Sequence, residues 1–451
     1  MLQIEKVRVL LISTYELGRQ PFGLASPAAW LRQRGHEVVC ADVAINPLPS
    51  LAVREAELVA LYLPMHTATR LAGQLVPRIR ALNPEAHLCA YGLYAPLNEE
   101  YLHGLGVETI IGGEFEPGLA SVAERLSRGL VQQVEPLVTI DRVRFLEPDR
   151  GTLPSLSRYA KLHVNGSSKV AGYTEASRGC KHLCRHCPVV PVYEGVFRIV
   201  QPEVVLADVR RQVEAGAQHI TFGDPDFLNG PRHALRVVEE LHHEFPGLTY
   251  DITAKIEHLR LHREFIATLR ETGCLFVTTA VEAVDDAVLA KLEKGHTRAD
   301  FVAVVEDFRA AGVALAPTFI PFTPWTTRQG YAELLAVIAE LGLVESVAPV
   351  QLALRLLITA RSRLLELEDV RRVTGEFDRA ALIYRWRHAE PAVDSLAAAA
   401  LKVVNEEQRL KTPRRSVFAR LWQLVHERPL PEDYDLLPRA AIPYMDEPWF
   451  C

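Results

Sequence analysis

The sequence has few cysteines, no long hydrophobic run and no excess of positive charge. Its 451 residues include seven cysteines, and those outside one short segment are scattered, which argues against disulfides and for a reducing, cytoplasmic setting. The longest apolar region, residues 343–360, contains Glu345, Gln351 and Arg355, so we expect a buried strand there and no membrane span. The formal net charge of −6 gives no global field that would attract nucleic acid.

The N-terminus shows no signal peptide, because it leads directly into a strand-like stretch at residues 7–12. A chain of this length with 49% hydrophobic residues can bury two or three domain cores. We find no repeat and no low-complexity tract. We therefore expect a multidomain protein with neither a nucleic-acid partner nor a membrane partner.

Three of the cysteines lie close together, at Cys180, Cys184 and Cys187. Thiolates three or four residues apart on one loop can converge on a single face of an iron–sulfur cluster, and Gly179 lets the backbone approach closely. A [4Fe-4S] cluster has four irons, so three ligands leave one iron for a group that is not protein. The segment therefore predicts an open [4Fe-4S] cluster.

A structural zinc site is the alternative for the same segment. The three thiols with His182 or His186 would make a Cys3His ligand set. Zinc sites normally pair two short ligand clusters, whereas the next cysteine, Cys274, lies far away in an apolar stretch. The spacing favours the cluster and leaves zinc as the second reading.

Residues 1–140 alternate short apolar strands with helical segments, which predicts an α/β, Rossmann-like, doubly wound parallel sheet. We expect strands at 7–13, 37–41, 58–63, 87–91 and 109–111, and helices near 25–34 and 67–82. Residues 141–169, rich in turn formers and charge, read as a linker.

Residues 170–360 then repeat a strand–helix pattern six times, which predicts a (βα)6 partial barrel with its functional loops at the C-terminal ends of the strands. The expected strands are 171–177, 219–224, 249–256, 275–282, 314–322 and 350–358. Residues 361–451 read as a helical, amphipathic segment that covers the barrel. We expect Tyr384, Trp386, Phe418 and Trp422 to anchor its packing.

The C-x3-C-x2-C motif in this context resembles the signature of the radical S-adenosylmethionine (SAM) enzymes. In that family the open iron binds the methionine part of SAM, and one electron cleaves SAM to a 5′-deoxyadenosyl radical. The resemblance implies an electron donor such as flavodoxin or ferredoxin. Family members usually carry Tyr, Phe or Trp before the third cysteine, near the adenine, whereas this chain carries His186.

Later segments resemble the SAM-binding elements of the same family. Asp224, in the segment Phe222-Gly223-Asp224-Pro225, takes the place of a residue that binds the SAM amino group. Glu282 corresponds to a glutamate that accepts hydrogen bonds from the SAM ribose. Lys294 and Arg298 are candidates to neutralise the SAM carboxylate, and Phe319 is a candidate to pack beside the adenine.

The N-terminal region resembles the cobalamin-binding domain of many radical SAM enzymes, through Arg34-Gly35-His36-Glu37-Val38 and Gly112-Gly113-Glu114-Phe115-Glu116. The loop at residues 13–23 contains no histidine, so no side chain from it should ligate cobalt. The candidate cobalamin contacts are Tyr15, Gly92, Gly113 and Glu114. A Rossmann-like domain without the cofactor is the alternative.

The resemblance implies cobalamin-dependent methylation of an unactivated carbon in a small-molecule or peptide substrate. Non-methylating radical SAM chemistry and a non-catalytic zinc-binding module are the alternatives. The terminal Trp449-Phe450-Cys451 also resembles the Cys-Sec-Ala-Glu-Pro or Cys-Cys-Ala-Glu-Pro tail of a small radical SAM subgroup, cut after its first cysteine. An incidental terminal cysteine explains this ending equally well.

Overall fold

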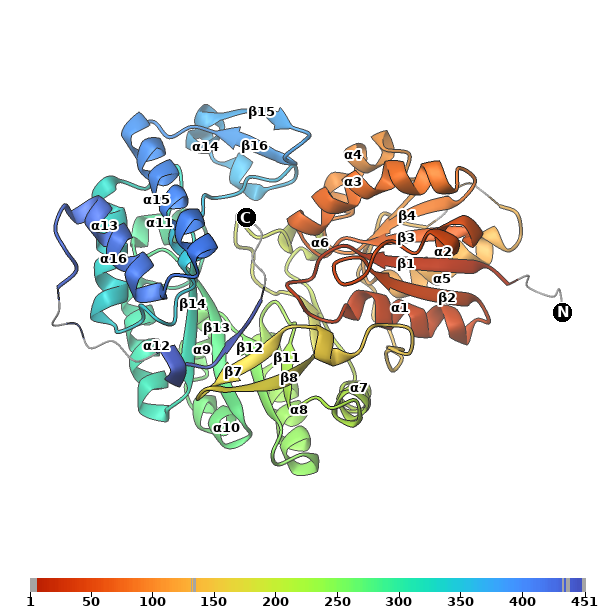
Figure 1. Cartoon of the computed structure of the whole chain (residues 1–451), viewed down its shortest axis with the longest axis horizontal. Coiled ribbons are helices and arrows are strands. Elements are labelled where there is room, and N and C mark those ends of the chain that lie inside the picture. Colours follow the sequence, from red (N-terminus) through yellow and green to blue (C-terminus); the bar gives the residue numbers. More distant parts are fainter. Residues whose placement is uncertain (1–5, 131, 133–134, 432–433, 435–438, 448–451) are drawn as a thin grey trace.

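A computed structural model describes residues 6–130, 132, 135–431, 434 and 439–447 of the chain. Two α/β units lie side by side, and the C-terminal helices pack on the outer side of the second unit (Figure 1). The terminal residues 449–451, where the sequence resembles a Cys-Sec-Ala-Glu-Pro tail, lie outside the described residues.

The N-terminal unit is a six-stranded parallel sheet in the order β2-β1-β3-β4-β5-β6. Its strands are β1 (Arg8–Ser13), β2 (Glu37–Asp42), β3 (Leu58–Tyr62), β4 (His87–Tyr91), β5 (Thr109–Gly113) and β6 (Val138–Thr139). Its helices are α1 (Phe22–Gln33), α2 (Ser50–Glu55), α3 (His66–Leu82), α4 (Glu99–Gly104) and α5 (Phe115–Leu126). The predicted doubly wound sheet is confirmed.

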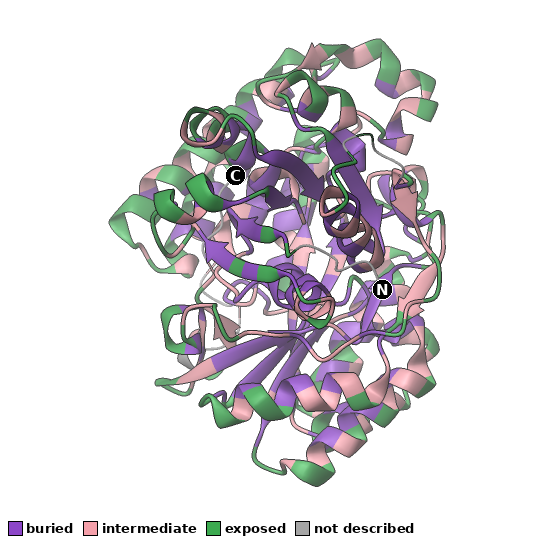
Figure 2. Ribbon diagram, turned by 90° about the vertical axis from the view of Figure 1, so that its right-hand side faces the viewer, coloured by how far each residue is buried: buried purple, intermediate pink, exposed green. Residues whose placement is uncertain are grey.

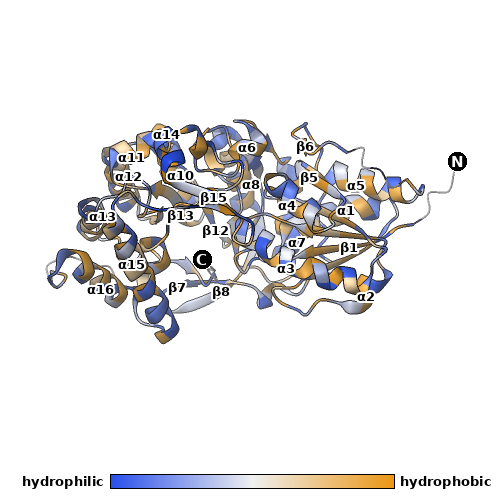
Figure 3. Cartoon of the chain, turned by 90° about the horizontal axis from the view of Figure 1, so that it is seen from above, coloured by the Kyte–Doolittle hydropathy of each residue, from blue (hydrophilic) through white to orange (hydrophobic). Residues whose placement is uncertain are grey.

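Both faces of this sheet are covered, which is why its strands are continuous apolar runs. Alternate strand residues such as Leu11 and Ala60 pack against α1 and α5, and the intervening Leu10 and Leu61 pack against α2, α3 and α4. Figure 2 shows the strands as buried ribbons inside partly exposed helices, and Figure 3 shows the same strands as hydrophobic. The strand order reverses between β1 and β3, where open parallel sheets bind ligands at their C-terminal edge.

The second unit is a curved sheet in the order β14-β13-β12-β11-β8-β7-β17. Its strands are β7 (Lys161–Val164), β8 (Ser167–Thr174), β11 (His219–Phe222), β12 (Thr249–Thr253), β13 (Cys274–Glu282), β14 (Ala314–Phe319) and β17 (Tyr444–Met445). Five consecutive strands, β14, β13, β12, β11 and β8, are parallel, as expected for a partial barrel. Strand β7, inside the expected linker, is antiparallel to β8.

Helices cover the outer face of the curved sheet. They are α7 (Pro202–Glu214), α8 (Pro231–Glu244), α9 (Ile256–Leu261), α10 (Phe265–Glu271), α11 (Asp286–Lys291), α12 (Arg298–Ala311) and α13 (Arg328–Glu340). The predicted sixth strand is not formed: residues Pro349–Leu352 make a 3-10 turn, and only Arg355 forms a bridge, with Phe322. Pro349 explains the difference, because its fixed φ suits the first position of a helical turn.

The C-terminal segment is not wholly helical, which corrects the sequence prediction. Between α14 (Glu368–Val373) and α15 (Pro391–Leu410) it forms a hairpin of β15 (Thr374–Asp378) and β16 (Ile383–Trp386). Tyr384 and Trp386 therefore lie on a strand, in keeping with the β preference of aromatic residues. Phe418 and Trp422 of α16 (Arg414–His426) are buried as predicted. No helix in the described part of the chain is long and apolar enough to cross a membrane.

Candidate active site

The cysteine loop follows β8 and starts from a small antiparallel ribbon of β9 (Ser177–Gly179) and β10 (Phe197–Ile199). Cys180 and Cys184 are buried and Cys187 is partly buried. Gly179 has φ +72°, and a Cβ there would lie 2.4 Å from the Tyr193 ring and 2.5 Å from the Val196 carbonyl oxygen. The loop therefore needs glycine at position 179 to pass under α6 (Val190–Tyr193).

Neighbouring polar groups hold this loop in place. The Lys181 backbone N–H donates to Asn229 Oδ1 at 3.2 Å, and the Asn229 amide donates to the Gly179 carbonyl at 3.4 Å. Burial raises the pKa of Cys187 to about 12 and raises that of Cys180. These thiols would ionise at neutral pH only beside a strong local cation, and a metal centre supplies one.

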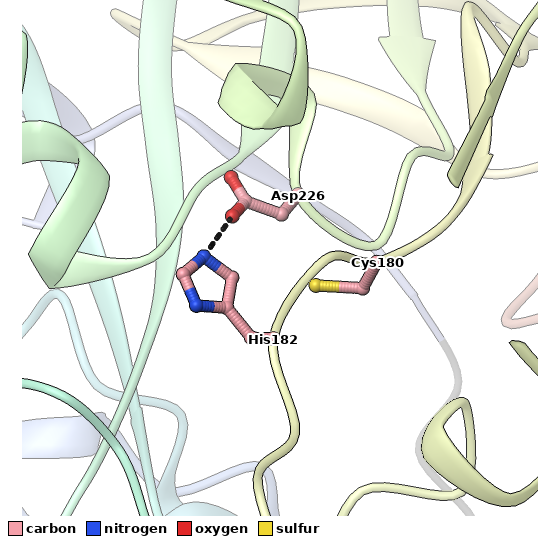
Figure 4. A group of neighbouring side chains, drawn as sticks. All are labelled: Cys180, His182 and Asp226. Carbon is pink, nitrogen blue, oxygen red and sulfur yellow. Dashed lines mark ion pairs between the residues drawn. The ribbon is translucent and has the colours of Figure 1, made fainter. Parts of the chain in front are cut away.

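The structure does not gather the ligands of the Cys3His zinc alternative. Among the described residues, one trio of potential ligand atoms lies within 4.8 Å of one another, and it comprises Cys180, His182 and Asp226 (Figure 4). In a tetrahedral zinc site, where zinc–sulfur bonds are near 2.3 Å, ligand atoms lie about 4 Å apart. That trio contains just one of the three thiols, so the described residues do not present a preformed Cys3His set.

The other histidine of the motif, His186, faces Glu282 at the end of β13. Glu282 Oε1 lies 3.1 Å from His186 Nε2 and accepts a hydrogen bond from Lys294 Nζ at 3.2 Å. Burial alone would raise the pKa of Glu282, but Lys294 and His186 outweigh it and lower the pKa to about 2. The residue is therefore an ionised acceptor, and its Oε2 makes no hydrogen bond with another described residue.

The backbone at Glu282 is unusual, with φ +70°. A non-glycine residue in the left-handed region costs energy, and such strain gathers at functional sites. The register of β13 against β14 shifts at the same place, between Ala280 and Glu282. Glu282 at this irregular strand end also lines a small cavity, together with Ile320 and Thr323.

Asp224 lies beside the cysteine loop, and both of its oxygens have local partners. Oδ1 accepts from the Ser177 hydroxyl at 2.5 Å and Oδ2 from the Ala176 backbone N–H at 3.0 Å. Burial raises the pKa of this carboxyl to about 7. These contacts tie the end of β11 to the start of the cysteine loop, and the expected contact with a SAM amino group stays a prediction.

Two further predicted SAM contacts have other partners in this structure. Phe319 lies opposite Glu282 in the register of β13 and β14 but is fully buried against Phe301 of α12, whereas its neighbour Ile320 lines the cavity with Glu282. Arg298 begins α12 and pairs with Glu333 on the surface. A contact of Phe319 or Arg298 with SAM stays a prediction.

The sequence analysis did not single out His296 and Lys255, two buried side chains in this part of the barrel. His296 is buried with neither ring nitrogen hydrogen bonded among the described residues, and burial with Lys294 and Lys255 lowers its pKa to about 4. Lys255, at the end of β12, is buried and its Nζ donates to Glu257 at 3.1 Å. Their positions after strand ends were the available signal, since such ends meet at one edge of a parallel barrel.

A cavity of about 250 Å³ separates the N-terminal sheet from the barrel. Four loops of the N-terminal unit contribute to it, through Glu16 with Arg19, Pro64 with Met65, Leu93, and Gly113. Barrel residues, Tyr193 and Gly179 of the cysteine loop among them, form the opposite wall. The cavity therefore lies at the C-terminal edge of the sheet and next to the cysteines.

The other predicted cobalamin contacts are placed differently. Tyr15 lines a separate groove beside α3. Gly92 has φ +104°, and a Cβ there would lie 3.1 Å from the Leu63 carbonyl oxygen. Glu114 is fully buried, 3.3 Å from Arg178 and 3.2 Å from the Tyr193 hydroxyl. Of the four candidates, only Gly113 lines the cavity between the two units.

Arg178, two residues before Cys180, joins the two units. Its guanidinium donates to Glu116 at 2.6 and 2.8 Å and to Glu175 at 2.7 Å, and it also contacts Glu114. The cation lies 4.7 Å from the centre of the Phe115 ring. Because Glu114 and Glu116 belong to the N-terminal unit, these contacts link that unit to the start of the cysteine loop.

Comparison with known proteins agrees with this geometry. Residues 174–335 match the family model described as the Radical SAM superfamily. A hopanoid C-3 methylase from Methylococcus capsulatus is 23% identical over 320 residues, which cover 68% of this chain and 62% of that protein. A tRNA-2-methylthio-N(6)-dimethylallyladenosine synthase from Geobacter sulfurreducens is 26% identical over 192 residues, 39% of this chain and 42% of that protein.

Two solved structures share the arrangement of both units. OxsB, a cobalamin-dependent SAM radical enzyme with aqua-cobalamin bound, superposes with TM-score 0.71 at 14% identity, over 90% of this chain and 67% of that one. TsrM from Kitasatospora setae, with cobalamin and a [4Fe-4S] cluster bound, gives 0.58 at 16% identity, over 74% and 73%. Residues 174–335 therefore match the Radical SAM superfamily model, and the chain has the fold of these two solved enzymes.

Proposed function

We propose that this protein is a radical SAM enzyme that holds a [4Fe-4S] cluster on Cys180, Cys184 and Cys187 and uses cobalamin to methylate an unactivated carbon. The observation that carries the proposal is the position of the three thiols. They lie on the loop after β8, between the ionised Glu282 at the end of β13 and the cavity below the N-terminal sheet. A cluster on this loop would be adjacent to both sites.

The thiols suit a cluster in number and in environment. When bound, the cluster supplies the single electron that cleaves SAM. The chain's own residues then have distinct tasks. Asn229 and Asp224 fix the loop, Glu282 offers Oε2 as an acceptor for the ribose hydroxyls, and Lys294 keeps Glu282 ionised.

The lining of the cavity between the units suits a corrin in chemistry. Tyr62, Met65, Leu93 and Phe115 offer apolar surface, and Gly113 lets the backbone approach. No histidine or cysteine side chain occurs among the described residues that line it, so this wall would offer cobalt neither an imidazole nor a thiolate ligand. When bound, cobalamin supplies the carrier of the transferred methyl group.

The volume of the same cavity sets a requirement for this fit. About 250 Å³ is smaller than ordinary ligand pockets, which are roughly 300–1,000 Å³, and a corrin is larger than most ligands of that class. Cobalamin binding therefore requires the walls to move apart. One side of the cavity is formed by a single segment, the loop at residues 14–21, through Glu16 and Arg19.

Iron and sulfide analysis with Mössbauer spectra of anaerobically purified protein tests the cluster. We expect about four irons per chain in the wild type, and loss of the cluster in Cys187→Ala but not in the matched control Cys40→Ala, because Cys40 lies in the core of the N-terminal unit. Stoichiometric zinc without iron would contradict the proposal.

Incubation with reductant and methyl-labelled SAM tests the reaction class. Methylation predicts both 5′-deoxyadenosine and S-adenosylhomocysteine as products. Deoxyadenosine alone would support a non-methylating radical reaction. Retention of cobalamin, followed by electron paramagnetic resonance of its reduced form, tests the cofactor, and a nitrogen splitting from a histidine would contradict the assignment of the cavity.

A further inference from the structure

The end of the described chain runs toward the candidate active site. Strand β17 pairs antiparallel with β7, with Tyr444 opposite His163 and Met445 opposite Leu162. Since β7 is itself antiparallel to β8, β17 runs in the same direction as β8, whose C-terminal end leads to the cysteine loop. Figure 1 shows this dark blue segment passing along the barrel toward the N-terminal unit.

Glu447, two residues after β17, forms an ion pair with Arg19 of the loop between β1 and α1. The two side chains are 10% and 19% exposed, so the pair is largely out of water. The guanidinium lies 5.2 Å from the centre of the Tyr173 ring on β8, and Arg19 Nε has no hydrogen-bond partner among the described residues. The contact joins residues 428 positions apart.

This ion pair stands between two cavities. Arg19 lines both the cavity of about 250 Å³ between the units and a second one of about 90 Å³ inside the barrel. Glu447 lines only the second, together with Asp251, Thr278 and Thr318 of the barrel strands. Arg19 is thus the residue that the described linings of the two cavities share.

The charges around the inner cavity favour a bound anion. Arg19, Arg414 and Arg439 line it, against the carboxylates of Asp251 and Glu447. Arg414 and Arg439 each donate to the Glu345 backbone carbonyl, at 3.0 and 3.1 Å; neither forms an ion pair with another described residue, although the Glu345 carboxylate lies near enough to attract both. Asp251 already accepts from Thr221 at 2.6 Å. Burial and the nearby Asp251 raise the pKa of Glu447, whereas Arg19 lowers it and so favours the ionised form of Glu447.

We propose that Arg19 is the anion-binding residue of the substrate site, that it recognises a carboxylate on the substrate, and that Glu447 occupies this position until substrate displaces it. The proposal rests on the proposed function in placing the substrate beside the cysteine loop. A carboxylate is the favoured class because Glu447 itself presents one to the planar guanidinium, whose fork matches that geometry. The C-terminal segment is then a wall of the site that a substrate acid can move.

Calorimetric titration of the purified full-length protein with benzoate, a simple carboxylate, tests this inference. Glu447→Gln keeps the size of the side chain and removes the competing charge, so we expect it to bind benzoate at least tenfold more tightly than the wild type. Adding Arg19→Gln to this variant should abolish saturable binding, and Arg19→Lys should keep part of it. Glu427→Gln, an exposed glutamate paired with Arg328, is the matched control and should behave like the wild type.

Equal benzoate affinity in Glu447→Gln and the wild type would overturn the proposal. So would binding that persists in the double variant, because the anion would then lie elsewhere. Tighter binding of inorganic phosphate than of benzoate would overturn the carboxylate assignment. Circular dichroism of each variant shows whether it is folded. The titration needs neither cluster nor SAM, so iron analysis of the same samples separates failure of this inference from failure of the proposed function.

Discussion

Replacing Glu282 with glutamine tests the SAM side of the site. The change keeps the volume of the side chain and removes a charge that lies 3.2 Å from the Lys294 ammonium and 3.1 Å from the His186 ring. Hydrogen bonds to charged groups contribute roughly 1.5–3 kcal/mol each. Loss of the charge in one or two ribose contacts should therefore weaken SAM binding by about 10- to 100-fold.

The same substitution also affects the stability of the folded protein, and the low pKa of Glu282 determines the direction of this effect. The pKa of Glu282 lies at about 2, below its ordinary value, so its charge stabilises the folded protein above pH 4.5 and this contribution is lost as the pH falls toward 2. Removing the carboxylate leaves the buried Lys294 without its counter-charge, which costs about 3–5 kcal/mol at neutral pH when a buried pair loses one member. Urea unfolding at pH 7 and at pH 2 measures this contribution, because most of it is lost between pH 4.5 and 2.

The assay for binding is anaerobic calorimetry with SAM, after iron content has shown that the cluster is intact. Glu333→Gln serves as the control, because Glu333 also forms an ion pair, with Arg298, but is 47% exposed and lies on the surface. We expect normal SAM affinity in this control. Unchanged affinity in Glu282→Gln with a full cluster would refute the placement of the ribose site.

Further predictions concern the groups that fix the cysteine loop. Arg178→Met should lower the free energy of unfolding by about 3–5 kcal/mol, because it leaves buried carboxylates unpaired. The control Arg210→Met, at an exposed ion pair, should change this free energy little. Equal effects of the two substitutions in urea unfolding would contradict the role of Arg178. Burial raises the pKa of Glu114 to about 7, so the wild type should lose up to about 3 kcal/mol of stability as the pH rises from 4.5 to 7. Glu114→Gln removes this loss. Thermal unfolding should therefore show the variant to be more stable than the wild type at pH 8 but not at pH 4. Asp224→Asn should lower cluster content, because asparagine has one acceptor oxygen where aspartate uses two, for the Ala176 N–H and the Ser177 hydroxyl. Weaker SAM binding with a full cluster would instead support the direct SAM contact predicted from the sequence.

The N-terminal sheet could be predicted from the sequence because its strands are buried on both faces. Runs such as residues 58–62 and 88–91 are short, apolar and buried, and glycines mark several of the turns between elements. The same rule failed at residues 350–358. That run is apolar except for Gln351 and Arg355, but Pro349 starts a 3-10 turn, and only Arg355 pairs with the neighbouring strand.

Positions on a strand were harder to assign than the strand itself. Phe319 and Ile320 are both apolar and adjacent, and side chains alternate between the two faces of a sheet. The structure turns Phe319 toward α12 and Ile320 toward the cavity of Glu282. An apolar pair at a strand end contains no information about which member faces inward, so the sequence could not distinguish them.

Contacts between distant charged residues had no local signal at all. Arg178 pairs with Glu116, 62 positions away, and Arg19 pairs with Glu447, near the other end of the chain. Each of these residues reads by itself as ordinary surface charge, and only the packing of the two units removes them from water. Buried pairs of this kind cost desolvation energy and add little net stability, whereas they fix geometry strongly. Because both pairs border the cysteine loop or the cavity beside it, the site depends on the two units packing together, and neither unit contains it alone.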